Sequence, residues 1–137
     1  WLTMEQGNGK WRFTSPTHVV RAFARSLEEL EQEGGIEKRW QRYKENNGYL
    51  ISNMKGMGFT PLLKSDYQSP IITAFLSPTH PDYGFKKFYQ ILKTQGFVIY
   101  PGKVTQMDTF RIGNIGDIHM EDMIRLIEAV SEAAYWQ

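Results

Sequence analysis

Pro70-Ile71-Ile72-Thr73-Ala74-Phe75-Leu76 is the stretch that decides the fold, because Thr73 is its only polar residue. A short, nearly continuous apolar run of this kind is typical of a strand that is buried on both faces. We therefore predict a central strand here. Three further strands are expected, at Phe59–Leu63, at Phe97–Tyr100 and at Asp108–Ile112. The Pro101-Gly102 pair is predicted to end the strand that precedes it.

Helical patterns surround these strands. Ser15 is predicted as an N-cap with Pro16 at the first helical position, and Gly34 is predicted to end that helix. A second helix is predicted from Ile36 to Gly58, with one face buried along its whole length. Two more helices are marked by apolar residues at helical spacing, namely Phe85, Phe88, Tyr89 and Leu92, and then Met120, Met123, Ile124, Ile127 and Val130. The order predicts an α/β (α+β) fold in which two N-terminal helices precede a small mixed sheet covered by helices.

Composition narrows the class of protein. With 137 residues, 41% hydrophobic and 23% charged, the chain has the size and apolar content of one folded domain. Sixteen Lys and Arg against fifteen Asp and Glu leave a net charge of +1, which gives no electrostatic case for nucleic acid or an anionic membrane. The absence of cysteine excludes disulfides and thiolate metal sites and fits a reducing cytoplasm. No apolar run approaches the roughly 20 residues that span a bilayer.

Few residues carry the usual signatures of catalysis. His18, His80 and His119 fall on different predicted elements without ligand spacing, so we interpret each as a capping or surface residue and expect no metal site. Nucleophile elbows, Walker loops and dinucleotide-binding glycine motifs are absent from the sequence. The spacing of Gly113 and Gly116 matches the loop of an RNA-binding KH domain, but the basic neighbours of such a loop are missing.

The start of the first long helix is one candidate binding site. Thr14, Ser15 and Thr17 place three hydroxyls where a helix presents unpaired N–H groups and the positive end of its dipole. An anion such as phosphate could bind there. A plain N-cap explains the same residues.

Arg111 is the second candidate. Alternation along its strand predicts that Phe110 and Ile112 are buried and that Arg111 points to the opposite face, beside the glycines at 113 and 116. A guanidinium fork in such a place suits a carboxylate or phosphonate, which it can bind through two parallel hydrogen bonds. A surface arginine on a strand is the alternative.

Four segments carry a resemblance to a known family. They are GKWRFTSPTH at 9–18, SPIITAF at 69–75, GFVIYPGK at 96–103 and FRIGNIG at 110–116. In this order and spacing the chain resembles the 2-aminoethylphosphonate–pyruvate aminotransferase family from Trp1 to Trp136. The last segment is similar to class V aminotransferases in general, whereas the first and third narrow the resemblance to this family.

The resemblance implies a pyridoxal 5'-phosphate enzyme of fold type I that works as a cytoplasmic homodimer in phosphonate catabolism. It implies transfer of the amino group of 2-aminoethylphosphonate to pyruvate, giving phosphonoacetaldehyde and L-alanine. Arg111 matches the arginine that anchors the acidic group of the substrate. Thr14 matches a threonine that contacts the cofactor phosphate of the other subunit. Neither nucleic acid nor a membrane is implied as a partner.

The family's cofactor-binding lysine and the aspartate that pairs with the cofactor's ring nitrogen lie upstream of the stretch that matches Trp1. We therefore expect a C-terminal piece of the enzyme, with no catalytic residue of its own and inactive alone. Residues 1–34 are expected to be the edge of the large cofactor-binding domain and a connecting helix. Residues 35–137 are expected to be the small domain. Apolar surface is expected to be exposed at Trp1, Trp11, Phe13 and the first long helix.

Two other functions fit parts of the sequence. A stand-alone regulatory or small-anion-binding α/β module built around Arg111 would bind its anion as an isolated domain. An RNA-binding module would bind single strands in a salt-dependent way. The near-neutral charge of the chain argues against the RNA-binding module.

Overall fold

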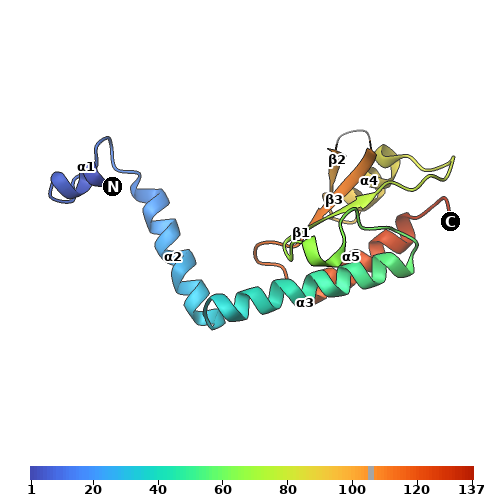
Figure 1. Ribbon diagram of the computed structural model, residues 1–137, viewed down its shortest axis with the longest axis horizontal. Coiled ribbons are helices and arrows are strands. Elements are labelled where there is room, and N and C mark those ends of the chain that lie inside the picture. The colour runs from blue at the N-terminus through green and yellow to red at the C-terminus, as the bar shows by residue number, and fades with distance from the viewer. Residues whose placement is uncertain (105–106) are drawn as a thin grey trace. The chain divides into compact units, whose positions relative to one another are not determined.

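The computed structural model describes residues 1–104 and 107–137 (Figure 1). Within this part the chain forms two compact units, Trp1–Arg39 and Trp40–Gln137, and each is described by itself. The second unit contains every strand and all of the buried apolar core. It therefore holds the part of the fold that positions a site.

The first unit is helical and has no core of its own. It holds α1 (Leu2–Gln6), α2 (Thr17–Glu33) and the first turn of α3, and no residue of α1 or α2 is buried. α2 starts later than predicted, because Pro16 and not Ser15 is its N-cap, and no side chain caps it. Gly34 ends it as predicted, in the left-handed conformation with φ 105°, which favours glycine. The expected exposure of apolar residues is confirmed, at Trp1, Trp11, Phe13, Val19, Val20, Phe23 and Leu27.

Helix α3 (Gly35–Gly56) is buried along only part of its length. Its buried side chains begin at Asn46 and continue with Leu50 and Met54. Ile36 and Trp40 are 77% and 52% exposed, so the predicted burial of one whole face is wrong. The reason is that strand β1 and the loop that precedes α5 meet α3 only from Arg42 onward, where side chains of α3 bond to Ile118 and Thr73.

The sheet is antiparallel throughout its three strands, β1 (Ile72–Leu76), β2 (Tyr100–Val104) and β3 (Met107–Gly113), in the order β1-β3-β2. The prediction of a mixed sheet is therefore wrong. The predicted central position of the apolar run is also wrong, because the run forms β1 and the middle strand is β3. The segment Phe59–Leu63 is not a strand but lies along the outer side of β1. It makes one bridge, Pro61 to Phe75, and two backbone hydrogen bonds of 2.8 and 2.9 Å.

Strand β2 begins at Tyr100 and runs through Pro101 and Gly102 instead of ending there as predicted. Proline has no backbone N–H to give to a ladder, and it is tolerated here because β2 is an edge strand of this sheet. The predicted strand at 108–112 is confirmed as β3, which extends it by one residue at each end.

Helices pack on one face of the sheet. The two predicted at 85–92 and 120–130 are confirmed as α4 (Phe85–Thr94) and α5 (Met120–Ala133). Phe88 of α4 lies 5.6 Å from Phe110 of β3, ring centre to ring centre, and Trp136 lies 5.3 Å from Phe88. Both phenylalanines are fully buried. This aromatic cluster fixes one face of β3 against the helices and leaves its other face available for a site.

Candidate functional site

Arg111 lies on the face of β3 that the helices do not cover. Phe110 and Ile112 on either side of it are 0% and 2% exposed, whereas Arg111 itself is exposed. The alternation predicted for these three residues is therefore confirmed. Because Phe110 and Ile112 both belong to the buried core, β3 cannot rotate to bury Arg111 without emptying the core.

The guanidinium of Arg111 is held by backbone and not by a carboxylate. Its Nη2 donates to the carbonyl oxygen of Pro101 on β2 at 3.3 Å. Within residues 1–104 and 107–137 this is its one hydrogen bond to protein, and no ion pair is found for it there. Tyr100 stands directly opposite Arg111 in the antiparallel register and is also exposed. A cation oriented by a neutral carbonyl keeps its charge for an external anion.

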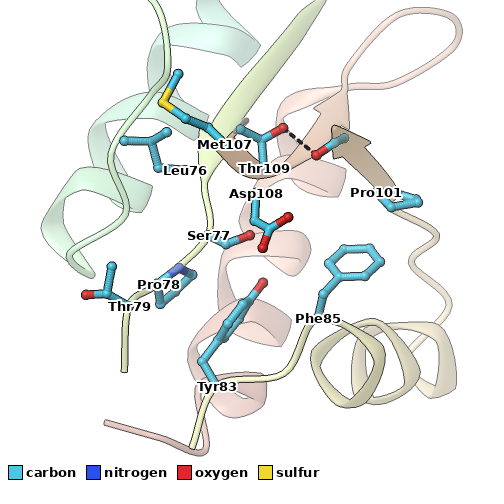
Figure 2. Close-up of a pocket in the computed structure, with 11 residues that line it drawn as sticks. Leu76, Ser77, Pro78, Thr79, Tyr83, Phe85, Pro101, Met107, Asp108 and Thr109 are labelled. Atoms are coloured by element: carbon cyan, nitrogen blue, oxygen red, sulfur yellow. Dashed lines mark hydrogen bonds between the residues drawn. The ribbon is translucent and has the colours of Figure 1, made fainter. Parts of the chain in front are cut away.

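A hollow of about 790 Å³ adjoins this strand pair at the other end of β3 (Figure 2). Figure 2 shows the hydroxyl of Tyr83 pointing toward Ser77 and Asp108, with Phe85 beside them. Burial raises the pKa of the Tyr83 phenol, the neighbouring Ser77 hydroxyl lowers it in part, and the negative charge of Asp108 raises it further. No sequence pattern predicted this hollow, since its lining comes from three separate segments.

Asn114 holds the end of β3, next to the predicted glycines. Its side-chain amide donates to the carbonyl oxygens of Pro70 at 2.8 Å and Tyr43 at 3.2 Å, and it is fully buried. Asn47 of α3 donates to the Thr73 hydroxyl at 2.8 Å beside it. These bonds join α3, β1 and β3 at one point, so the strand that carries Arg111 is fixed at its end as well as along its face. Asn114 was not among the residues predicted for the site.

Thr14 belongs to the first unit and is described within it. It is exposed, precedes the start of α2 and lines a hollow of about 400 Å³ together with Arg12 and Pro16. Since no side chain caps α2, the positive end of this helix remains open to an anion. Arg12 contributes a cation close by, although its guanidinium also stacks on Phe13 at 5.2 Å. The residues around Thr14 thus have the chemistry that binds a phosphate.

Two of the three histidines have structural roles, and His18 is exposed on α2. His119 is the N-cap of α5, where its backbone N–H donates to the Asp122 carboxylate at 3.0 Å. His80 is exposed and accepts a bond from the backbone N–H of Asp82. In the described part of the chain no group of three or more potential metal ligands comes together. No helix described here is both long and apolar enough to cross a membrane.

Comparison with known proteins confirms the resemblance. The chain is 61% identical over all 137 residues to the 2-aminoethylphosphonate–pyruvate transaminase of Vibrio vulnificus, and 59% identical over 135 residues to that of Bacteroides fragilis. It spans 37% of the length of each of these relatives. No protein-family model matches the chain.

Solved aminotransferases share the fold. The structure of alanine–glyoxylate aminotransferase from Nostoc matches with a TM-score of 0.79 at 22% identity, covering 92% of this chain and 33% of that one. The structure of ureidoglycine–glyoxylate aminotransferase from Bacillus subtilis matches with a TM-score of 0.82 at 18% identity, covering 98% of this chain and 36% of that one. The fold of this chain therefore matches about a third of the length of each of these two aminotransferases.

Proposed function

We propose that residues 1–137 are the C-terminal part of a pyridoxal 5'-phosphate aminotransferase that transfers the amino group of 2-aminoethylphosphonate to pyruvate, giving phosphonoacetaldehyde and L-alanine. The identity of 61% along the whole chain to transaminases of this name supports the substrate pair. The observation that carries the proposal is the exposed Arg111 guanidinium, oriented by the Pro101 carbonyl with no carboxylate partner found in the described residues.

Arg111 binds the acidic group of the substrate in this proposal. Both the phosphonate of the amino donor and the carboxylate of pyruvate present oxygens at a spacing that a guanidinium fork meets with two hydrogen bonds. Anchoring that end of the substrate positions its amino or keto carbon in the rest of the active site. One arginine on the open sheet face thus serves both halves of an amino exchange.

The residues around Thr14 fit one end of the cofactor, its phosphate. The uncapped start of α2, the exposed Thr14 hydroxyl and the Arg12 guanidinium are donors that suit a phosphate dianion. We propose that Thr14 binds the phosphate of the cofactor held by the other subunit of a homodimer. Bound pyridoxal phosphate would supply the electron sink for moving an amino group. The lysine that tethers the cofactor and the aspartate that pairs with its ring nitrogen are proposed to lie in the other part of the enzyme, so the chain is proposed to be inactive alone.

Two domains are proposed within the chain, residues 1–34 as the edge of the large domain with a connecting helix, and residues 35–137 as the small domain. The division of the structure at Arg39 and Trp40 lies close to this boundary, inside α3. A cytoplasmic location is proposed together with the enzyme, in keeping with a chain that has no cysteine.

A chimeric enzyme, here called the exchange enzyme, tests the proposal. The segment of the Vibrio vulnificus transaminase that matches residues 1–137 is replaced by this chain, and the product is loaded with pyridoxal phosphate. We expect L-alanine to form from pyruvate when 2-aminoethylphosphonate is the donor, and no product from residues 1–137 alone. An exchange enzyme that folds and holds the cofactor but transfers no amino group from this donor would contradict the proposal.

A further inference from the structure

The Arg111 side chain lies beside Gly102 of β2, which has no side chain. Gly102 and Thr109 are register partners on the two strands, and the Thr109 hydroxyl donates to the carbonyl oxygen of Gly102 at 2.7 Å. Thr109 is buried and stands two residues before Arg111, so both side chains project from the same face of β3. Figure 2 shows the Thr109 bond among the residues that line the hollow.

A side chain at position 102 would collide with this arrangement. A Cβ placed on Gly102 would lie 2.6 Å from the Thr109 hydroxyl oxygen, much closer than real Cβ atoms approach, and 3.5 Å from Nε of Arg111, which is ordinary contact. The side chain of Thr109 would have to move. Its displacement would break the bond to Gly102 and disturb the adjacent Pro101 carbonyl, which orients the guanidinium.

We propose that Gly102 is a positioning residue for Arg111: the bare backbone at 102, bonded to Thr109, forms the seat on which the guanidinium is held at the angle that receives the acidic group of the substrate. This inference rests on the proposed function. The backbone conformation of Gly102 is not the reason for a glycine here, since its φ lies outside the left-handed range. Space beside Thr109 and Arg111 is the reason.

Binding of ethylphosphonate to the exchange enzyme tests the seat. This probe carries the acidic group but no amino group, so it binds without reacting, and calorimetry gives both its Kd and the number of sites. We expect Gly102→Ala to weaken binding about tenfold, as when one charge-assisted hydrogen bond loses its geometry. A merely structural role would lower the number of sites titrated and leave the Kd of the remaining sites unchanged.

Two further variants separate the causes. Thr109→Ala removes the atom that the new Cβ would strike, so Gly102→Ala combined with Thr109→Ala should bind ethylphosphonate as tightly as Thr109→Ala alone. The double variant also serves if Gly102→Ala by itself does not fold. Gly48→Ala is the matched control, because a Cβ there meets nothing within 4 Å and Gly48 lies in helix α3 away from the sheet face. Its Kd should equal that of the unaltered exchange enzyme.

The outcomes are distinct. Unchanged affinity in Gly102→Ala, or a double variant that binds more weakly than Thr109→Ala alone, would overturn the seat while leaving the proposed function intact. An unaltered exchange enzyme that holds its cofactor but binds no ethylphosphonate would overturn the proposed function, and the seat with it.

Discussion

Replacing Arg111 by lysine in the exchange enzyme should lower kcat/KM for 2-aminoethylphosphonate by about 10- to 150-fold. The lysine keeps the positive charge, but it loses the planar fork and with it one of two parallel bonds to the acidic group. A hydrogen bond to a charged group is worth about 1.5–3 kcal/mol, and about 1.4 kcal/mol corresponds to a factor of ten in rate. The bond from Arg111 to the Pro101 carbonyl, 3.3 Å long, is also lost, so the remaining ammonium is less well oriented.

The measurement is a steady-state rate of L-alanine formation over a range of donor concentrations. Arg125→Lys is the matched control, since Arg125 is an exposed arginine on α5 that pairs with Asp122 at 3.5 Å and stacks on Phe97. It should leave kcat/KM unchanged. If Arg111→Lys transfers the amino group as efficiently as the control, Arg111 does not touch the substrate and the reasoning about the fork is wrong.

Four other outcomes are expected. Thr14→Val keeps the shape of the side chain without its hydroxyl and should weaken the retention of pyridoxal phosphate by the exchange enzyme on dialysis. Thr79→Val is the control and should not weaken it. Equal retention in the two variants would remove Thr14 from the phosphate site. Residues 40–137 should unfold cooperatively in urea, because they contain the whole core, whereas residues 1–39 should show no transition; a transition in the shorter piece would contradict this. Phe88→Ala in residues 40–137 should lower the free energy of unfolding by about 3–5 kcal/mol, since the ring is fully buried against Phe110 and Trp136, and a loss below about 1 kcal/mol would refute that packing. The pKa of Tyr83 is raised in the folded state, so its contribution to stability is complete below the ordinary tyrosine value of about 10 and is lost as the pH rises above it. Tyr83→Phe should therefore flatten the fall in unfolding free energy as the pH rises above about 10, and an unaltered slope there would count against the buried phenol.

Periodicity predicted α4, α5 and the middle strand well. Phe85, Phe88 and Leu92 repeat at helical spacing, and Phe110 and Ile112 alternate with Arg111, so one face of each element was recognisable from local pattern alone. Arg111 could be proposed as a site residue for the same reason. Its two neighbours on the strand are buried, and alternation along the strand then places the Arg111 side chain on the opposite face.

Tertiary contacts decided what the pattern could not. The apolar run predicted a strand that is central and buried on both faces, but only one face of β1 is buried and its outer edge is paired by a segment, Phe59–Leu63, that makes a single bridge to Phe75 and is not a strand. The pair Pro101-Gly102 predicts a strand end, because proline lacks a donor and glycine lacks a side chain. β2 is an edge strand, where a missing donor is tolerated, and a side chain at position 102 would collide with Thr109. Neither fact is local to the sequence.

We propose that this chain belongs to an enzyme that transfers the amino group of 2-aminoethylphosphonate. The most direct measurement follows the visible absorption of bound pyridoxal phosphate in the complete polypeptide that contains residues 1–137. Addition of 2-aminoethylphosphonate should convert the cofactor to its amino form, and pyruvate should restore the original spectrum with one L-alanine formed per site. A cofactor spectrum that responds to neither compound would contradict the claim.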